Sequence, residues 1–122
     1  MSVPLLICDD SLMSRKMIIK ALPAEWDVEI TQASNGKEAL QVIRDGRCDV
    51  LFLDLTMPEL DGYQVLEILQ NEGRQLKVLV ISADVQQEAL ERVRRLGALD
   101  FVRKPIDADN LRQVLNKHGI LA

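Results

Sequence analysis

The chain has 122 residues and a net charge of −4 at pH 7; 48% of its residues are hydrophobic and 28% are charged. This is the size and composition of one ordinary globular domain. The negative charge argues against a nucleic-acid or acidic-membrane partner, and no apolar stretch approaches the roughly 20 residues that cross a bilayer. The N-terminus lacks a signal-peptide pattern, so we expect a cytoplasmic protein whose two cysteines, Cys8 and Cys48, are reduced and packed.

Five apolar runs alternate with five segments of helical periodicity. The runs, which we expect to form strands, are residues 3–8, 28–33, 48–53, 78–81 and 99–103. Three of the helical segments follow the capping residues Ser11, Asp61 and Asp107. The expected buried stripe of the first segment consists of Ser14, Met17, Ile18, Ala21 and Leu22.

This alternation predicts an α/β fold, with a parallel sheet and five helices on its two faces. Right-handed crossovers leave few topologies, and five strands fit the flavodoxin-like, doubly wound order 2-1-3-4-5. In such a sheet, ligands bind at the carboxyl edge, at the switch point between the first and third strands. We expect residues 1–122 to be one domain with a site at that edge.

Four of the expected strands end in residues that can do chemistry. Asp9 and Asp10 follow the first strand, Asp54 the third, Ser82 the fourth and Lys104 the fifth. Each alone has an ordinary explanation, as a helix cap, a turn residue or a solvated charge. All of them at one edge of the sheet are much harder to explain as independent caps.

Three neighbouring carboxylates repel one another, and a cation stabilises such a cluster. Carboxylates with a backbone carbonyl and water suit Mg²⁺, which commonly also binds a phosphoryl group. The Lys104 ammonium and the Ser82 hydroxyl are suitable donors to phosphoryl oxygens, and Asp54 can act as a nucleophile. These residues predict Mg²⁺-dependent phosphoryl chemistry.

The combination closely resembles the receiver domain of bacterial two-component response regulators, over essentially the whole chain. The resemblance is carried by Cys8-Asp9-Asp10-Ser11, residues 53–62 (LDLTMPELDG), Ile81-Ser82-Ala83 and Phe101-Val102-Arg103-Lys104-Pro105. With no effector domain in these residues, the chain is similar to stand-alone receivers of the chemotaxis type. A receiver that forms part of a longer regulator with an effector domain is the alternative.

The resemblance implies a phosphorelay switch without turnover of an external substrate. Asp54 would accept a phosphoryl group from a phosphohistidine on a sensor histidine kinase or a histidine phosphotransfer protein. Asp9, Asp10 and Asp54 would hold Mg²⁺ together with the backbone carbonyl of Thr56. Lys104 would meet the phosphoryl oxygens.

The same resemblance implies a switch and its output. Ser82 would move toward the phosphoryl group, Phe101 would turn inward behind it, and the Lys104–Pro105 peptide would be cis. By the same resemblance, Thr56 and Asp84 occupy places that the family uses to tune the lifetime of the phosphate. The altered surface would bind a downstream effector protein, without direct contact to nucleic acid or membrane, as a monomer or a phosphorylation-dependent dimer.

Four arginines mark the expected output face: Arg92, Arg94, Arg95 and Arg103. The alternative interpretation is a solvated helix face paired with Glu88 and Glu91. The methionines are interpreted as dispersed, without forming a groove for a partner. Asp100 is interpreted as a turn residue and His118 as solvated.

Three other functions fit these residues less well than the switch does. A Mg²⁺-dependent phosphatase of the haloacid-dehalogenase type would use Asp54 as nucleophile, but its second acidic residue is replaced by Thr56. A flavodoxin-like nucleotide-binding domain would need a hydroxyl-rich or glycine-rich loop after the first strand, where Asp9 and Asp10 stand. A receiver-like adaptor that is never phosphorylated would not need the complete set of site residues.

Overall fold

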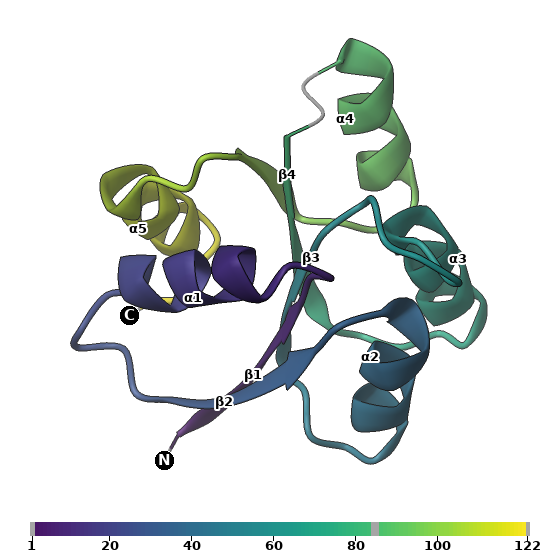
Figure 1. The fold of residues 1–122 in the computed structure, drawn as a ribbon, viewed down its shortest axis with the longest axis horizontal. Helices are drawn as coiled ribbons and strands as arrows, with labels where there is room; N and C mark the ends of the chain where they lie inside the picture. Colours follow the sequence, from purple (N-terminus) through teal and green to yellow (C-terminus); the bar gives the residue numbers. More distant parts are fainter. Residues whose placement is uncertain (1, 84–85, 122) are drawn as a thin grey trace.

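The computed structural model describes residues 2–83 and 86–121. Over these residues, strands and helices alternate strictly (Figure 1). The strands are β1 (Val3–Cys8), β2 (Val28–Ala33), β3 (Val50–Leu53), β4 (Lys77–Ser82) and β5 (Asp100–Arg103). The helices are α1 (Leu12–Ala21), α2 (Gly36–Arg44), α3 (Gly62–Asn71), α4 (Gln87–Arg95) and α5 (Ala108–Lys117). None of these helices, which cover the described part of the chain, has the length and apolar character to span a membrane.

The strands form one parallel sheet in the order β2-β1-β3-β4-β5, so the expected flavodoxin-like, doubly wound fold is confirmed. The expected start of β3 at Cys48 is wrong by two residues. Its register against β1 begins at the Leu5–Val50 pair, because the preceding residue of β1, Pro4, has no N–H to donate to the ladder. The sheet edge at β2 is partly exposed, with Ile30 open to solvent.

The core has two layers, one on each face of the sheet. Figure 1 shows α1 and α5 on one side, and α2, α3 and α4 on the other. Side chains alternate between the layers along β1, as the pleat of a strand requires: Leu5 and Ile7 pack in the first layer, and Leu6 and Cys8 pack in the second. Cys8 and Cys48 are free and buried, as expected, and burial raises the pKa of each thiol to about 12.

Helix α1 contacts the sheet through a narrower stripe than its sequence predicts. Ile18 and Ala21 are buried, but Ser14 and Leu22 are only partly buried. The expectation that Met17 is buried is wrong, since 45% of this residue is exposed. The reason is the position of α1 near the carboxyl edge, where Ser14 contacts the polar site described below and Met17 lines a pocket.

Candidate functional site

Three carboxylates meet at the carboxyl ends of the neighbouring strands β1 and β3. Cys8 pairs with Leu53 in the ladder, so the next residues of the two strands, Asp9 and Asp54, emerge side by side. One oxygen from each of Asp9, Asp10 and Asp54 lies within 4.8 Å of the others. Asp9 and Asp54 are buried, whereas Asp10 is exposed to solvent.

Lys104 supplies positive charge to this cluster from the end of β5. Its Nζ atom lies 2.7 Å from Oδ2 of Asp9 and 3.6 Å from Oδ1 of Asp54. The backbone N–H of Lys104 donates to the carbonyl of Ser82 at 2.9 Å, which ties this end of β5 to β4. The Lys104–Pro105 peptide is cis, as expected. Lys104 therefore places one positive charge beside two buried carboxylates.

Asp9 is held by donors from α1 as well as by Lys104. Its Oδ1 accepts a hydrogen bond from the backbone N–H of Ser11 at 2.9 Å, and its Oδ2 accepts one from the Ser14 hydroxyl at 2.6 Å. The Arg15 guanidinium donates to the Asp9 carbonyl at 2.6 Å. Sequence reasoning found Ser11 as the cap of α1, which is confirmed by its bond from the Ser14 N–H. It missed the contacts of Ser14 and Arg15 with Asp9.

Asp54 is poorly stabilised as an anion. Burial, followed by the charge of Asp9, raises the pKa of Asp54 from 3.8 to about 6. Lys104 and the hydrogen bond from the Leu55 N–H, 2.9 Å from Oδ1, oppose this rise, and Asp10 adds to it. A second cation next to these acids would favour ionised Asp54.

The loop after β3 is fixed by close packing of α3. A Cβ atom on Gly62 would lie 2.3 Å from the backbone carbonyl oxygen of Asp54, so only glycine fits there. The Gly62 N–H donates to the Leu55 carbonyl at 3.0 Å. Asp61 and Gln64 form a reciprocal capping box at the start of α3, which confirms Asp61 as a cap. The backbone on both sides of the Asp54 side chain is thereby held in place.

Comparison with known proteins identifies the family. Residues 5–116 match the model of the response regulator receiver domain. The chemotaxis protein CheY of Listeria monocytogenes is 37% identical over 114 residues, which cover 93% of this chain and 95% of the relative. The chain belongs to the receiver-domain family. Receiver domains act as signalling switches of two-component systems.

Solved structures support the same assignment. The receiver domain of AraT, a response regulator from Geobacillus stearothermophilus, is 31% identical with a TM-score of 0.84, covering 96% of this chain and 92% of that one. A chain in the CheX–CheY–BeF3–Mg complex from Borrelia burgdorferi is 26% identical with a TM-score of 0.85, and the match covers 96% of this chain and 89% of that one. The acid cluster of this receiver domain lies where the sheet order places its switch point.

The remaining predicted site residues that the structure describes differ in burial. Ser82 is buried at the end of β4, and Thr56 is exposed in the loop after β3. Phe101 lies on β5 beside Val80 and is partly buried against the layer of α2, α3 and α4. Asp84 falls outside the described residues.

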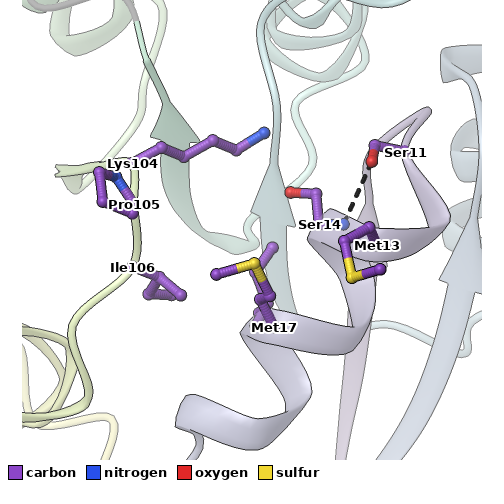
Figure 2. Close-up of a pocket in the computed structure, with 8 residues that line it drawn as sticks. Ser11, Met13, Ser14, Met17, Lys104, Pro105 and Ile106 are labelled. Atoms are coloured by element: carbon purple, nitrogen blue, oxygen red, sulfur yellow. Dashed lines mark hydrogen bonds between the residues drawn. The ribbon is translucent and has the colours of Figure 1, made fainter.

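An apolar pocket of about 290 Å³ opens beside the acid cluster, between α1 and the segment after β5. Figure 2 shows Met17 and Ile106 on opposite sides of it, with Lys104 and Ser14 at its inner end. Met13 also lines it and is 66% exposed. The interpretation that the methionines are dispersed is therefore wrong for Met13 and Met17, which line the same pocket. Met13 and Met17 are four residues apart, and this spacing places them on the same face of a helix, which could have been recognised from the sequence.

The arginines of α4 differ in their surroundings. Arg92 lies 4.0 Å from the centre of the Tyr63 ring and 3.7 Å from Glu67, both on α3. The acid that Arg92 pairs with is thus Glu67, and not Glu88 or Glu91 as the alternative interpretation had it. Arg94 and Arg103 instead line a groove of about 210 Å³, together with Leu90, Phe101, Asp100 and Asn110.

Asp100 and His118 form a pair that the sequence did not reveal. Asp100 begins β5, and its Oδ2 lies 2.8 Å from Nε2 of His118 at the end of α5. Its Oδ1 accepts a hydrogen bond from the Phe101 N–H, and Lys117 lies 3.7 Å away. Burial acts to raise the pKa of Asp100, but the contacts with His118, Phe101 and Lys117 lower it overall. The expectations of a turn residue and a solvated histidine are both wrong.

Proposed function

We propose that residues 1–122 act as one receiver domain that accepts a phosphoryl group on Asp54 from a phosphohistidine of a sensor histidine kinase or a histidine phosphotransfer protein. The observation that carries this proposal is the buried Asp54 carboxylate, raised in pKa, beside two further acids and the Lys104 ammonium. Carboxylates can be nucleophiles in phosphoryl transfer. The switch itself, and not turnover of an external substrate, is the activity.

In the transfer, an oxygen of ionised Asp54 attacks the phosphorus of the donor. The new O–P bond forms as the N–P bond breaks, and the electron pair of the N–P bond returns to the imidazole nitrogen. The transition state gathers negative charge on the oxygens of the phosphoryl group. Lys104, already 3.6 Å from Asp54, is the ammonium that can donate to them. Ser82 is the hydroxyl assigned to another of these oxygens.

The donor set fits Mg²⁺. Asp9, Asp10 and Asp54 offer carboxylate oxygens within 4.8 Å of one another, and hard oxygen ligands suit this ion. The backbone carbonyl of Thr56 is the fourth assigned ligand. When bound, Mg²⁺ would supply positive charge that favours ionised Asp54 and offsets the charge of the phosphoryl oxygens.

A protein donor has to cover the rim of the site to bring its phosphohistidine to Asp54. The pocket of Met13, Met17 and Ile106 lies at that rim and presents apolar surface, which is the kind of contact that stabilises a docked partner. We assign this pocket to the phosphodonor.

The output is assigned to the opposite flank of the site. Movement of Ser82 toward the phosphoryl group would open space for Phe101, which already lines the groove between α4 and α5. Arg94 and Arg103 give that groove positive charge. A downstream effector with an acidic, partly apolar segment would fit it.

The deciding experiment replaces Asp54 by Asn and treats both proteins with acetyl phosphate in Mg²⁺. The wild type should gain one phosphoryl group that hydroxylamine removes, as expected for an acyl phosphate, and Asp54→Asn should gain none. Asp45→Asn, at an exposed aspartate on α2's far end, is the control and should label normally. Equal labelling of Asp54→Asn would show that Asp54 is not the acceptor.

A further inference from the structure

The Ser14 hydroxyl and the Lys104 ammonium donate to the same oxygen of Asp9. Ser14 Oγ lies 2.6 Å and Lys104 Nζ lies 2.7 Å from Asp9 Oδ2. Figure 2 shows both groups pointing toward one place at the inner end of the pocket. A carboxylate oxygen has two lone pairs available for hydrogen bonds, so these two donors fill the capacity of Oδ2.

Asp9 is 1% exposed, so water has little access to this oxygen. A buried acceptor that loses a donor has to be compensated within the protein. If Lys104 moves from Asp9 to a phosphoryl group on Asp54, the Ser14 hydroxyl is the donor that remains on Oδ2. The Ser11 N–H stays on the other oxygen, Oδ1.

We propose that Ser14 is a positioning residue for Lys104: its hydroxyl keeps Asp9 Oδ2 hydrogen-bonded, and this allows Lys104 to leave Asp9 for the phosphoryl group. The inference rests on the proposed function of Asp54. Without the Ser14 hydroxyl, Lys104 would be the one remaining protein donor of the two that the structure shows at Oδ2, and Asp9 would hold it more strongly. Lys104 would then be less available to the oxygens at Asp54.

The test measures binding of beryllofluoride, a phosphoryl mimic, in Mg²⁺, and the rate of labelling by acetyl phosphate. Ser14→Ala should weaken beryllofluoride binding and slow labelling by about tenfold, the size of one hydrogen bond to a charged group. Ser14→Thr, which keeps the hydroxyl, should restore both. Alanine is a good helix former, so Ser14→Ala should keep α1 folded, and thermal unfolding checks this.

A double-mutant cycle separates positioning from a merely structural effect. In the Lys104→Ala background, Ser14→Ala should cause no further loss of beryllofluoride affinity, because the residue that it positions is absent. The same tenfold loss in both backgrounds would overturn the proposal, as would a Ser14→Ala protein that binds like the wild type. Failure of the wild type itself to label would overturn the proposed function, and the Ser14 assignment with it.

Discussion

Lys104 holds two buried carboxylates at once, and this decides how Asp54 ionises. Its ammonium is 2.7 Å from Asp9 but 3.6 Å from Asp54, so Asp9 receives the stronger contact. Asp54 is left with a pKa near 6, raised first by burial and then by Asp9. Asp54, the proposed nucleophile, is thus poorly stabilised as an anion, which favours its reaction with an electrophilic phosphorus once it is ionised.

This raised pKa predicts a specific dependence of stability on pH in the absence of Mg²⁺. Unfolded Asp54 ionises at its ordinary pKa of 3.8, whereas folded Asp54 ionises only near 6. The folded state therefore binds more protons between these values, and its stability falls as the pH rises through them. The neutral Asp54→Asn variant avoids this loss, so its advantage over the wild type should grow by up to about 3 kcal/mol from acidic to neutral pH.

Urea unfolding of both proteins in chelator, across this pH range, measures the effect. Comparing the two proteins cancels the other carboxylates, such as Glu25 and Glu72, whose pKa values are lowered by arginines and whose contributions have the opposite sign. Parallel pH profiles for the two proteins would show that Asp54 ionises normally.

At the scale of elements, the start of α3 is packed directly onto the end of β3. Gly62→Ala would place a methyl group 2.3 Å from the Asp54 carbonyl oxygen and 2.8 Å from the Leu55 Cα, and backbone atoms cannot rotate away as a flexible side chain can. We expect a loss of about 1–3 kcal/mol or more in the free energy of unfolding. Gly46→Ala is the matched control, since its Cβ would meet nothing within 4 Å and only its positive φ of 77° opposes it.

Gly46→Ala should lower the free energy of unfolding by about 1 kcal/mol, the usual penalty for alanine at a position with positive φ. Denaturant midpoints of the two variants give the comparison. A Gly62→Ala protein as stable as Gly46→Ala would mean that α3 can shift away from β3 at a cost of only about 1 kcal/mol.

Helix α1 should contribute to recognition of a protein donor but not of a small one. Met17→Lys places a charge in the apolar pocket, and transfer from a protein donor should slow by about tenfold, as for loss of a well-packed apolar contact. Labelling by acetyl phosphate should be unchanged, since it needs no docking surface. Ile30→Lys, at an exposed apolar residue of the β2 edge, is the matched control.

The measurement follows label transfer from a panel of autophosphorylated sensor kinases of the same organism to each variant. If Met17→Lys slowed labelling by acetyl phosphate to the same extent, Met17 would be needed for phosphoryl transfer itself or for the stability of the fold, and not for docking. Equal transfer to Met17→Lys and wild type would remove α1 from the docking surface.

Much of this arrangement follows from local patterns in the chain. The apolar run that stops at Asp54 predicts a buried strand with an acid at its carboxyl edge, and parallel topology then brings Asp9 to the same edge. Helical spacing alone does not fix how α1 tilts over the sheet, so it could not tell that Met17 faces a pocket. Asp100 and His118 are 18 residues apart, and they meet only because of how α5 returns along β5.

At the scale of the whole molecule, the three acids lie at the ends of β1 and β3, in the middle of the sheet. Folding brings their negative charges together, and the repulsion between them opposes folding. An ion that binds only the folded state should raise its stability in proportion to the logarithm of its concentration. We expect Mg²⁺ to raise the melting temperature of the wild type and to leave that of Asp10→Asn nearly unchanged. Asp45→Asn should respond like the wild type, and a response to Mg²⁺ shared by Asp10→Asn would argue against the assigned site.

The contact between Asp100 and His118 ties the first residue of β5 to the end of α5. Residues 100–118, which include Phe101, Arg103 and Lys104, therefore form a segment whose two ends are in contact with each other. A movement of Lys104 at the acid site would therefore displace β5 and α5 together. The acid site and the groove lined by Phe101 and Arg103 would then be coupled through this one short segment of the chain.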